Sequence, residues 1–182
     1  MIQKGNVLVA SPFLNDPYFA KTVVLLAEHN SEGSLGFILN KKLEVSIQEA
    51  ISGLVFFDAP IYYGGPVEEN ALFYIHTYPQ VKGAMEIMPN LYWGGDFEEI
   101  KNLLNTTLPD SSTIRFFAGY SGWGRGQLQN EMNSESWLLQ KISLKEVMNE
   151  ENLSKLWQKN ILRSKDERYI YWVNMPPDPS LN

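Results

Sequence analysis

Segment Gly119–Gln127 carries the residue types best suited to chemistry, because four glycines fall within eight positions and Arg125 stands among them. Glycine permits positive φ angles and close approach of a ligand to the backbone. A helix that starts after such a loop presents unpaired amides, which favour an anion. The segment therefore predicts a strand that ends in a glycine-rich loop, followed by a helix that begins near Gln127. A small anionic or phosphorylated ligand is one candidate occupant of this loop.

Three known glycine motifs fail at single positions of this segment. A P-loop needs a lysine near its end, and none follows here. A dinucleotide fingerprint needs glycine where Gln127 stands, and a nucleophile elbow after Ser121 needs glycine where Trp123 stands. Three interpretations stay open: a tight structural turn that exposes Tyr120 and Trp123, a surface for a ligand or protein partner, and a phosphate site.

Candidates for acid–base chemistry are few. Gln127, Glu131 and Glu135 follow at i, i+4 spacing, so a helix places them on one face, where two carboxylates could do acid–base or metal work. His29 and His76 are the only histidines of the chain, and neither belongs to a metal-binding spacing. The sequence therefore predicts no catalytic residue, no bound metal and no cofactor. Solvated acids and histidines at strand ends are the simpler interpretation.

Two further segments have special backbone chemistry. Gly64-Gly65-Pro66-Val67 predicts a rigid turn between two strands, since Pro66 fixes its own φ and restricts Gly65. Asn40 ends a predicted strand and can either cap the turn locally or offer its amide to a ligand. We expect these segments to form a binding surface with Trp123 as its anchor, because tryptophan is a common interface hot spot. The candidate binding residues are Asn40, Gly64, Gly65, Pro66, Tyr120, Trp123, Arg125, Gln127 and Glu131.

The elements that must position these residues are short strands interrupted by helices. The opening strands have no helix between them, which favours antiparallel pairing. We therefore predict an α+β fold in a single compact domain, residues 1–175, with a mainly antiparallel sheet flanked by helices and a proline-rich loose tail at 176–182. Runs of apolar, β-branched and aromatic residues predict strands at Val7–Ala10, Thr22–Ala27, Leu35–Leu39, Ile61–Tyr63, Ala71–His76, Ile114–Ala118 and Tyr169–Val173.

Turn and helix signals fall between the predicted strands. Asn30-Ser31-Glu32-Gly33 indicates a hairpin connection. The sequence Ser46-Ile47-Gln48-Glu49 is a capping box that opens a short helix. Asp96 can cap a second helix, a third begins near Gln127, and a fourth spans about 152–163.

Composition excludes several classes of protein. A chain of 182 residues suits one domain. Because it has no cysteine, it has no disulfide, no thiolate metal site and no cysteine nucleophile, which fits a reducing compartment. No segment reaches the ~20 apolar residues that span a bilayer, and the apolar stretch near the N-terminus is too short for a signal peptide. We expect a cytoplasmic protein without membrane contact.

Charge is distributed unevenly along the chain. The net charge of −6 argues against wholesale, sequence-independent attraction to nucleic acid. Residues 1–135 hold 8 Lys or Arg and 15 Asp or Glu, whereas residues 136–172 hold 7 and 5. The basic C-terminal region, residues 141–168, predicts a solvated helix face or, less favoured, a surface that binds nucleic acid. Its helix carries Lys155, Lys159, Arg163 and Lys165.

Several short blocks occur in a fixed order along the chain, among them Gly5–Pro12, Glu28-His29-Asn30, Leu35–Lys41, Gly64–Val67, Trp93–Phe97, Phe116–Gly124 and Gln127-Leu128 with Glu131. In these blocks the chain resembles the YqgE/AlgH family of small bacterial proteins. The resemblance implies a compact α+β fold with a largely antiparallel, partly barrel-like sheet. The family carries a transcriptional-regulator label, through a link to alginate production, and brings no established catalytic residues. The sequence gives that label no physical support, since no convincing helix–turn–helix is present.

The leading hypothesis is a non-enzymatic binding or regulatory module with an unknown protein partner or small ligand. The first alternative is an enzyme or binder that acts on a small anionic or phosphorylated ligand at Gly119–Gln127, with Glu131 or His76 for proton transfer. The second alternative is nucleic-acid binding through the basic C-terminal region.

Overall fold

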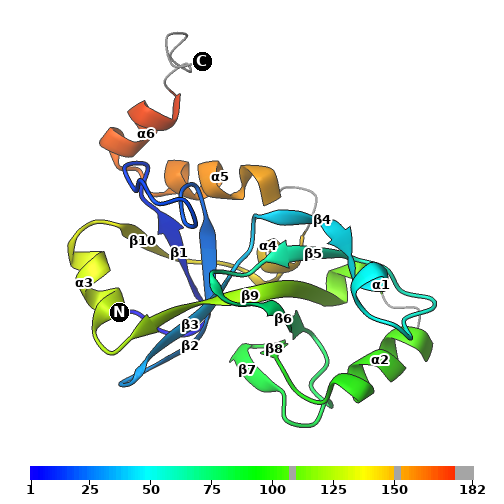
Figure 1. Cartoon of the computed structure of the whole chain (residues 1–182). Coiled ribbons are helices and arrows are strands. Elements are labelled where there is room, and N and C mark those ends of the chain that lie inside the picture. Colours follow the sequence, from blue (N-terminus) through cyan, green and yellow to red (C-terminus); the bar gives the residue numbers. More distant parts are fainter. Residues whose placement is uncertain (107–109, 150–152, 175–182) are drawn as a thin grey trace.

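Ten strands form the frame of the fold in the computed structural model, which describes residues 1–106, 110–149 and 153–174 (Figure 1). Six of the seven predicted strands are confirmed, and four strands were not predicted. The strands are β1 (Asn6–Ala10), β2 (Val23–Asn30), β3 (Gly33–Ile38), β4 (Lys42–Ser46), β5 (Pro60–Tyr63), β6 (Val67–His76), β7 (Met85–Met88), β8 (Leu91–Trp93), β9 (Ile114–Gly124) and β10 (Trp137–Lys141).

The sheet is large, antiparallel and open. Its main path runs β10-β1-β2-β3-β9-β6-β8-β7, with β4 and β5 attached beside β9. Among the described strands, the pairing of β5 with β9 is the parallel one, and the other pairs are antiparallel. The predicted single-domain α+β fold is thus confirmed. The partly barrel-like sheet is corrected, because the end strands β10 and β7 do not pair and the sheet does not close.

Strand β9 changes its neighbours halfway along its length. Its first half, residues 114–118, lies between β6 and β5, with Phe116 opposite Ile61. Its second half pairs with β3, with Ser121 opposite Gly36 and Gly124 opposite Gly33. The predicted glycine-rich loop is therefore wrong, since residues 119–124 continue the strand.

Helices cover the sheet and connect its strands. The capping box is confirmed, since Ser46 N donates to Glu49 Oε2 at 2.7 Å, and Asp96 Oδ1 accepts from Glu98 N at 2.9 Å at the start of the next helix. The helices are α1 (Ile47–Ala50), α2 (Phe97–Thr106), α3 (Gln127–Asn133), α4 (Leu144–Met148), α5 (Leu156–Arg163) and α6 (Glu167–Asn174), with 3-10 turns η1 (Ser111–Thr113) and η2 (Leu153–Lys155).

The predicted strand Tyr169–Val173 is wrong, because these residues lie in α6. Its aromatic and β-branched composition favours a strand. A local hydrogen bond opposes that preference, since Asp166 Oδ1 accepts from Arg168 N at 3.0 Å. The Tyr169 ring then packs against Phe13, with ring centroids 5.8 Å apart. Capping and tertiary packing therefore override local composition here.

Two hydrophobic clusters form the core. The larger one fills the space around β1, β2 and β3 and includes Trp157 of α5, whose Nε1 donates to Ala10 O at 2.8 Å. The smaller one joins α1, α2 and the first half of β9 through Ile47, Ile100 and Phe116. In Figure 1, α5 lies along the top of the sheet and α2 lies at the lower right. The predicted tail at 176–182 lies outside the described residues, so that boundary stays a prediction.

Candidate functional site

Two predicted site glycines, Gly64 and Gly65, meet Gly119, the first residue of the glycine-rich segment, at the point where β9 changes its neighbours. Gly64 and Gly65 are buried, and Gly119 has a φ of +68°. A Cβ on Gly64 or Gly65 would overlap the β9 backbone, and a Cβ on Gly119 would lie 2.5 Å from Gly65 O. We call Gly64, Gly65 and Gly119 the glycine junction. These glycines are required because two backbones of the same chain approach each other there.

Hydrogen bonds fix the same junction. Gly64 N donates to Ala118 O at 2.8 Å, which ends the pairing of β5 with β9. Gly64 O accepts from Ile38 N and from the Ser121 hydroxyl, each at 3.0 Å. Pro66 follows directly and is half-buried. The turn is therefore a rigid joint between β3, β5 and β9, in agreement with the rigid turn that its sequence predicts.

The Asn40 side chain contacts the backbone of residues far from it in the sequence. Its Oδ1 accepts from Val23 N at 2.8 Å, and its Nδ2 donates to Lys21 O at 2.9 Å. Lys21 has a φ of +58°, a conformation that favours glycine in most settings. The Asn40 amide therefore ties the end of β3 to the strained start of β2. This link between distant segments differs from the cap of its own turn that the sequence offered as one role.

Trp123 is buried, so the expectation of an exposed anchor is wrong. It is 5% exposed, and its ring packs near Phe19 and Trp137. Glu131 Oε2 accepts from the indole Nε1 of both Trp123 and Trp137 at 2.8 Å, and Glu131 Oε1 accepts from Gln127 Nε2 at 2.9 Å. The Glu131 carboxylate thus ties α3 to β9 and β10. This buried contact was not predictable from the local glycine pattern.

The turn before α3 lacks the predicted phosphate loop. Only Arg125 and Gly126 separate β9 from α3. The exposed Arg125 side chain pairs with Glu32 at 2.6 Å. Gln127 Oε1 accepts from Gly124 N at 3.0 Å, so this side chain closes the turn from within.

A groove lies on the other face of β9. Side chains alternate across a strand, so Tyr120, Gly122 and Gly124 share the face opposite Trp123. Directly across the ladder, Gly122 faces Leu35, and Gly124 faces Gly33. The groove has a volume of about 430 Å³. We call it the β3–β9 groove; its lining residues are Glu28, Asn30, Glu32, Gly33, Ser34, Leu35, Val67, Tyr120, Gly122, Trp123 and Gly124.

The groove is open because β9 has glycine where side chains would fit. Gly122 and Gly124 are exposed, and neither has a positive φ. A Cβ on Gly122 would come within 3.3 Å of a Tyr120 ring atom, and a Cβ on Gly124 would lie 3.9 Å from Gln127 Oε1. The Tyr120 ring itself packs edge-on against Phe73, with centroids 5.3 Å apart. Neither glycine is therefore demanded by backbone geometry.

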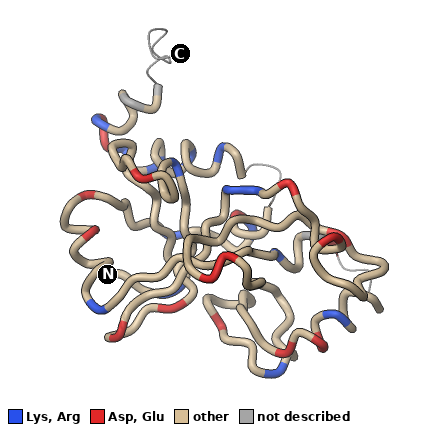
Figure 2. Tube along the Cα trace, viewed as in Figure 1, with Lys and Arg blue, Asp and Glu red and all other residues tan. Residues whose placement is uncertain are grey.

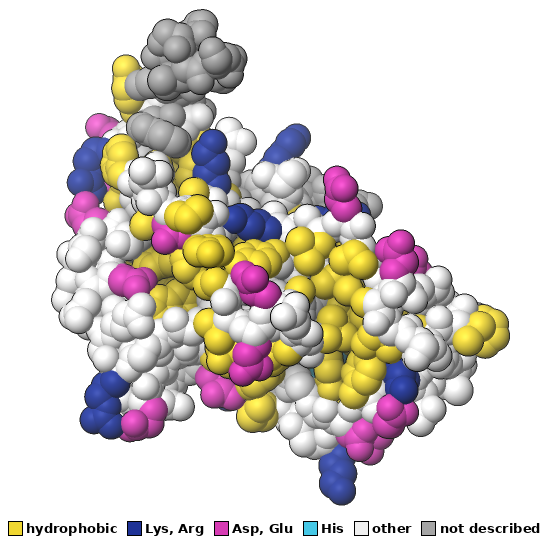
Figure 3. All heavy atoms as spheres, viewed as in Figure 1, with side chains coloured by type: hydrophobic (Ala, Val, Ile, Leu, Met, Phe, Trp, Pro, Cys, Tyr) yellow, Lys and Arg dark blue, Asp and Glu magenta, His cyan; other side chains and the backbone are white. Residues whose placement is uncertain are grey.

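The groove has acidic walls. Glu28 is half-buried on β2 opposite Leu35, and among the described residues it has no cationic partner. Glu32 stands at the hairpin tip and pairs with Arg125. Figure 3 shows acidic side chains set among hydrophobic ones across the middle of the molecule. A cationic group that entered the groove would find the Glu28 carboxylate and the Tyr120 ring among its lining residues.

The residues proposed for proton transfer lie apart. His76 is 0% exposed and stacks against Tyr78 and Tyr92. Burial lowers the pKa of His76, although the hydrogen bond to Gly94 O opposes that shift. Glu131 lies elsewhere, where its carboxylate accepts hydrogen bonds from the indoles of Trp123 and Trp137. In the described part of the chain, no cluster of three or more His, Asp or Glu residues could hold a metal ion.

Sequence reasoning missed the groove residues Glu28, Leu35 and Gly122 as a set. The signal lies in strand register, because the hairpin places Glu28 opposite Leu35 and β9 then places Gly122 beside Leu35. A β-bulge between Leu26 and Glu28 shifts that register, and a bulge is not visible in the residue pattern.

The fold and groove define a class of protein, a single-domain α+β fold with an open antiparallel sheet and helices on its flanks. The family model described as AlgH-like matches residues 7–169. The chain belongs to this AlgH-like family, which confirms the YqgE/AlgH resemblance of its sequence blocks.

Relatives in other bacteria match the chain along its whole length. It is 43% identical over 183 residues to the UPF0301 protein CT0663 of Chlorobaculum tepidum, a match that covers 100% of this chain and 97% of that protein. It is 38% identical to the UPF0301 protein BF2109 of Bacteroides fragilis, with 100% and 92% covered.

Two solved structures share the fold. The solution structure of the AlgH protein from Pseudomonas aeruginosa matches with a TM-score of 0.71 and 23% identity, covering 96% of this chain and 95% of that one. The crystal structure of protein DIP2367 from Corynebacterium diphtheriae gives a TM-score of 0.75 and 24% identity, covering 96% and 93%. In the described residues, no helix is both long and apolar enough to cross a membrane.

Proposed function

We propose that this chain is a non-enzymatic binding module, and that the β3–β9 groove holds an extended basic segment of a protein partner. The observation that carries the proposal is the pair Gly122 and Gly124. Both are exposed in a strand without a positive φ. Gly124 has room for a side chain, and a Cβ on Gly122 would require only a small shift of the Tyr120 ring. Glycine weakens a strand by roughly 0.5–1 kcal/mol relative to alanine, so two such positions in one strand indicate a use for the bare sheet face.

The chemistry of the walls favours a cationic segment. The half-buried carboxylate of Glu28 can pair with a lysine or arginine, and such charge-assisted hydrogen bonds are the stronger kind. The Tyr120 ring offers its face to the same cation. Leu35 and Val67 supply apolar contact along the floor. Strand β3 is already paired with β2 on one side and with β9 on the other, so the segment cannot add to the sheet there as a further strand. Side-chain contacts would recognise it instead.

Photo-crosslinking in cells tests this proposal. A photoreactive phenylalanine analogue replaces Glu32, which lines the groove and is exposed, and the matched control replaces Glu44, an exposed glutamate of β4 outside the groove. We expect position 32 to give one discrete crosslinked product whose peptide, identified by mass spectrometry, is rich in lysine or arginine. Equal products from both positions, or none from position 32, would contradict the proposal.

Neutralising the Glu28 carboxylate tests whether the groove recognises a cationic group. Glu28→Gln should weaken binding of the crosslinked segment, made as a synthetic peptide, by roughly tenfold, because one charge-assisted contact is lost. Glu44→Gln makes the same chemical change outside the groove and should leave affinity nearly unchanged. Fluorescence anisotropy of the labelled peptide measures both. Equal effects of the two changes would mean that only overall charge matters.

The two alternatives have weaker support. For nucleic-acid binding, much of the basic C-terminal region is paired internally, since Lys159 and Arg163 both contact Glu146 and Arg168 contacts Asp166. For an enzyme, Glu131 and His76 lie in separate clusters. A regulatory role and a cytoplasmic location remain parts of the hypothesis, and the lack of cysteine supports the location.

A further inference from the structure

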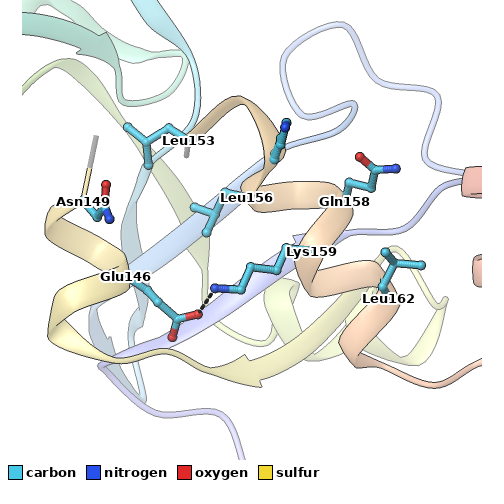
Figure 4. Close-up of a pocket in the computed structure, with 8 residues that line it drawn as sticks. Glu146, Asn149, Leu153, Leu156, Gln158, Lys159 and Leu162 are labelled. Carbon is cyan, nitrogen blue, oxygen red and sulfur yellow. Dashed lines mark hydrogen bonds and ion pairs between the residues drawn. The ribbon is translucent and has the colours of Figure 1, made fainter. Parts of the chain in front are cut away.

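A second hollow, of about 570 Å³, lies between α4 and α5 (Figure 4). It is lined by the helix that makes the C-terminal region basic. Lys155, Gln158, Lys159 and Leu162 are spaced by three or four residues, so they form one face of α5 and the turn before it. Volumes of 300–1,000 Å³, roughly, are typical of pockets for small ligands.

The hollow has an apolar floor. Leu153 and Leu156 are buried at 6% and 4% exposure, and Leu162 is 40% exposed at the rim. Figure 4 shows Lys159 extending from α5 to Glu146 on α4, with Leu156 near that contact and Leu153 farther from it. Leucines on the floor and charged ends at the rim form an amphipathic pocket.

Among the described residues that line this pocket, two lysines, Lys155 and Lys159, stand with one carboxylate, that of Glu146. Glu146 Oε1 accepts from both Lys159 Nζ at 2.8 Å and Arg163 at 2.6 Å, while its Oε2 accepts from the Ser143 hydroxyl at 2.9 Å. Both carboxylate oxygens are therefore occupied. Burial raises the pKa of Glu146, but these hydrogen bonds outweigh it and lower the pKa to about 2, so the group is ionised at neutral pH.

Lys155 is a lysine of this pocket that does not pair with the Glu146 carboxylate. It is exposed, it lines the hollow, and among the described residues it has no ion-pair partner. It also lies one turn from Lys159, an i, i+4 arrangement of like charges that destabilises a helix unless an anion lies between them. Figure 2 shows Lys and Arg residues recurring along α5, whereas acidic residues are spread over the rest of the chain.

We propose that the α4–α5 pocket binds a small amphipathic anion, a short aliphatic chain that carries a carboxylate or phosphate group. Lys155 and Gln158 hold the anionic group at the rim. Leu153, Leu156 and Leu162 contact the chain. This site is independent of the β3–β9 groove and of the partner proposed there.

An NMR titration of the full-length chain tests the site, with the amide signals of residues 153–163 as the readout. Hexanoate and hexyl phosphate are the two anionic probes, and they distinguish a carboxylate ligand from a phosphate ligand. Hexylammonium has the same chain with the opposite charge. We expect saturable shifts from at least one anion and at least tenfold weaker binding of hexylammonium. Equal binding of hexylammonium, or no saturable shift with either anion, would overturn the proposal.

Two pairs of variants locate the contacts. Lys155→Gln should weaken anion binding by about tenfold, whereas Lys165→Gln, the same change at an exposed lysine outside the pocket, should have little effect. Leu162→Ala should weaken hexanoate more than acetate, because only hexanoate reaches the leucines. Equal effects of the two lysine variants would reduce the site to general surface charge and overturn the proposal. An unchanged ratio of hexanoate to acetate affinity in Leu162→Ala would also contradict it.

Discussion

Strand β9 carries glycine in two settings that differ in what surrounds them. At the glycine junction, a side chain would collide with the backbone of β9 or of the Gly64–Val67 turn, and the Gly119 backbone is left-handed. In the β3–β9 groove, Gly122 and Gly124 have ordinary angles and only side-chain atoms nearby. The junction glycines are therefore explained by folding, whereas the groove glycines are not. Gly119 is thus needed for the chain to fold, whereas Gly122 and Gly124 leave a surface without side chains.

Gly119→Ala should have the largest effect on stability. The new methyl would lie 2.5 Å from Gly65 O, and alanine would have to adopt a φ of +68°. Overpacking and left-handed strain together should lower the free energy of unfolding by about 3–5 kcal/mol. Urea denaturation measures this loss.

Gly94→Ala is the matched control for that substitution. Gly94 has a φ of +67°, yet a Cβ there would have no atom within 4 Å. It should therefore show only the conformational cost of about 1–2 kcal/mol. If the two variants lost equal stability, close packing would not explain the junction.

Glu131→Ala should cause the second-largest loss of stability. It would leave the buried indole N–H groups of Trp123 and Trp137 without their acceptor, which costs about 2–4 kcal/mol in unfolding free energy. Glu131→Gln keeps one carbonyl oxygen and should lose less. Guanidinium denaturation, followed by tryptophan fluorescence, compares the variants. An alanine variant as stable as the wild type would show that these indoles find other partners.

Acid should weaken the first half of β9, where His76 lies opposite Ile114. His76 Nδ1 accepts from Tyr78 N at 3.2 Å, and its other ring nitrogen donates to Gly94 O at 3.0 Å, so the buried ring is neutral. Burial lowers the pKa of His76 below its ordinary value of 6.5. Protonation then favours the unfolded chain, so this contribution is complete above about pH 6.5 and declines as the pH falls, by at most about 1.4 kcal/mol per pH unit.

Unfolding curves between pH 5 and 8 measure this dependence, a range in which histidine is the main titrating side chain. His76→Gln should flatten the slope, whereas His29→Gln, which changes an exposed histidine, should keep it. A slope that survives in His76→Gln would assign the dependence to another group.

Gly124→Val should have the smallest effect on stability. Valine favours strands, the backbone angles at this position are ordinary, and the nearest atom to a new Cβ is 3.9 Å away. We expect the free energy of unfolding to stay within about 1 kcal/mol of the wild type in urea denaturation. A loss comparable to that of Gly119→Ala would remove the distinction between the two settings.

Local chemistry predicted much of the fold. The capping box at Ser46, the Asp96 cap and the Asn30–Gly33 hairpin were predictable because their partners lie within a few residues. The long central strands were predictable because their apolar, β-branched and aromatic residues stand in continuous runs. It failed at Tyr169–Val173, where a cap and a contact with Phe13 decide the outcome.

The candidate site was predicted less well, because its geometry depends on distant partners. Trp123 is buried by Phe19 and Trp137, which lie far from it in sequence. The glycine-rich segment around Trp123 therefore led to the wrong prediction that its side chain is exposed. Gly119 and Gly64 were correctly chosen as special backbone, but the surface that requires them is the chain itself. Both predicted aromatic residues line the groove, but Trp123 is buried there, whereas Tyr120 is half-buried.

If the bare face of β9 binds a partner, crosslinking from position 32 should depend on Gly124, and a Gly124→Val background tests this dependence. Valine would fill the groove beside Gly33 while the protein stays folded. We expect the crosslinked product to disappear and the free energy of unfolding to stay nearly unchanged. A product of undiminished yield in the folded valine variant would contradict it.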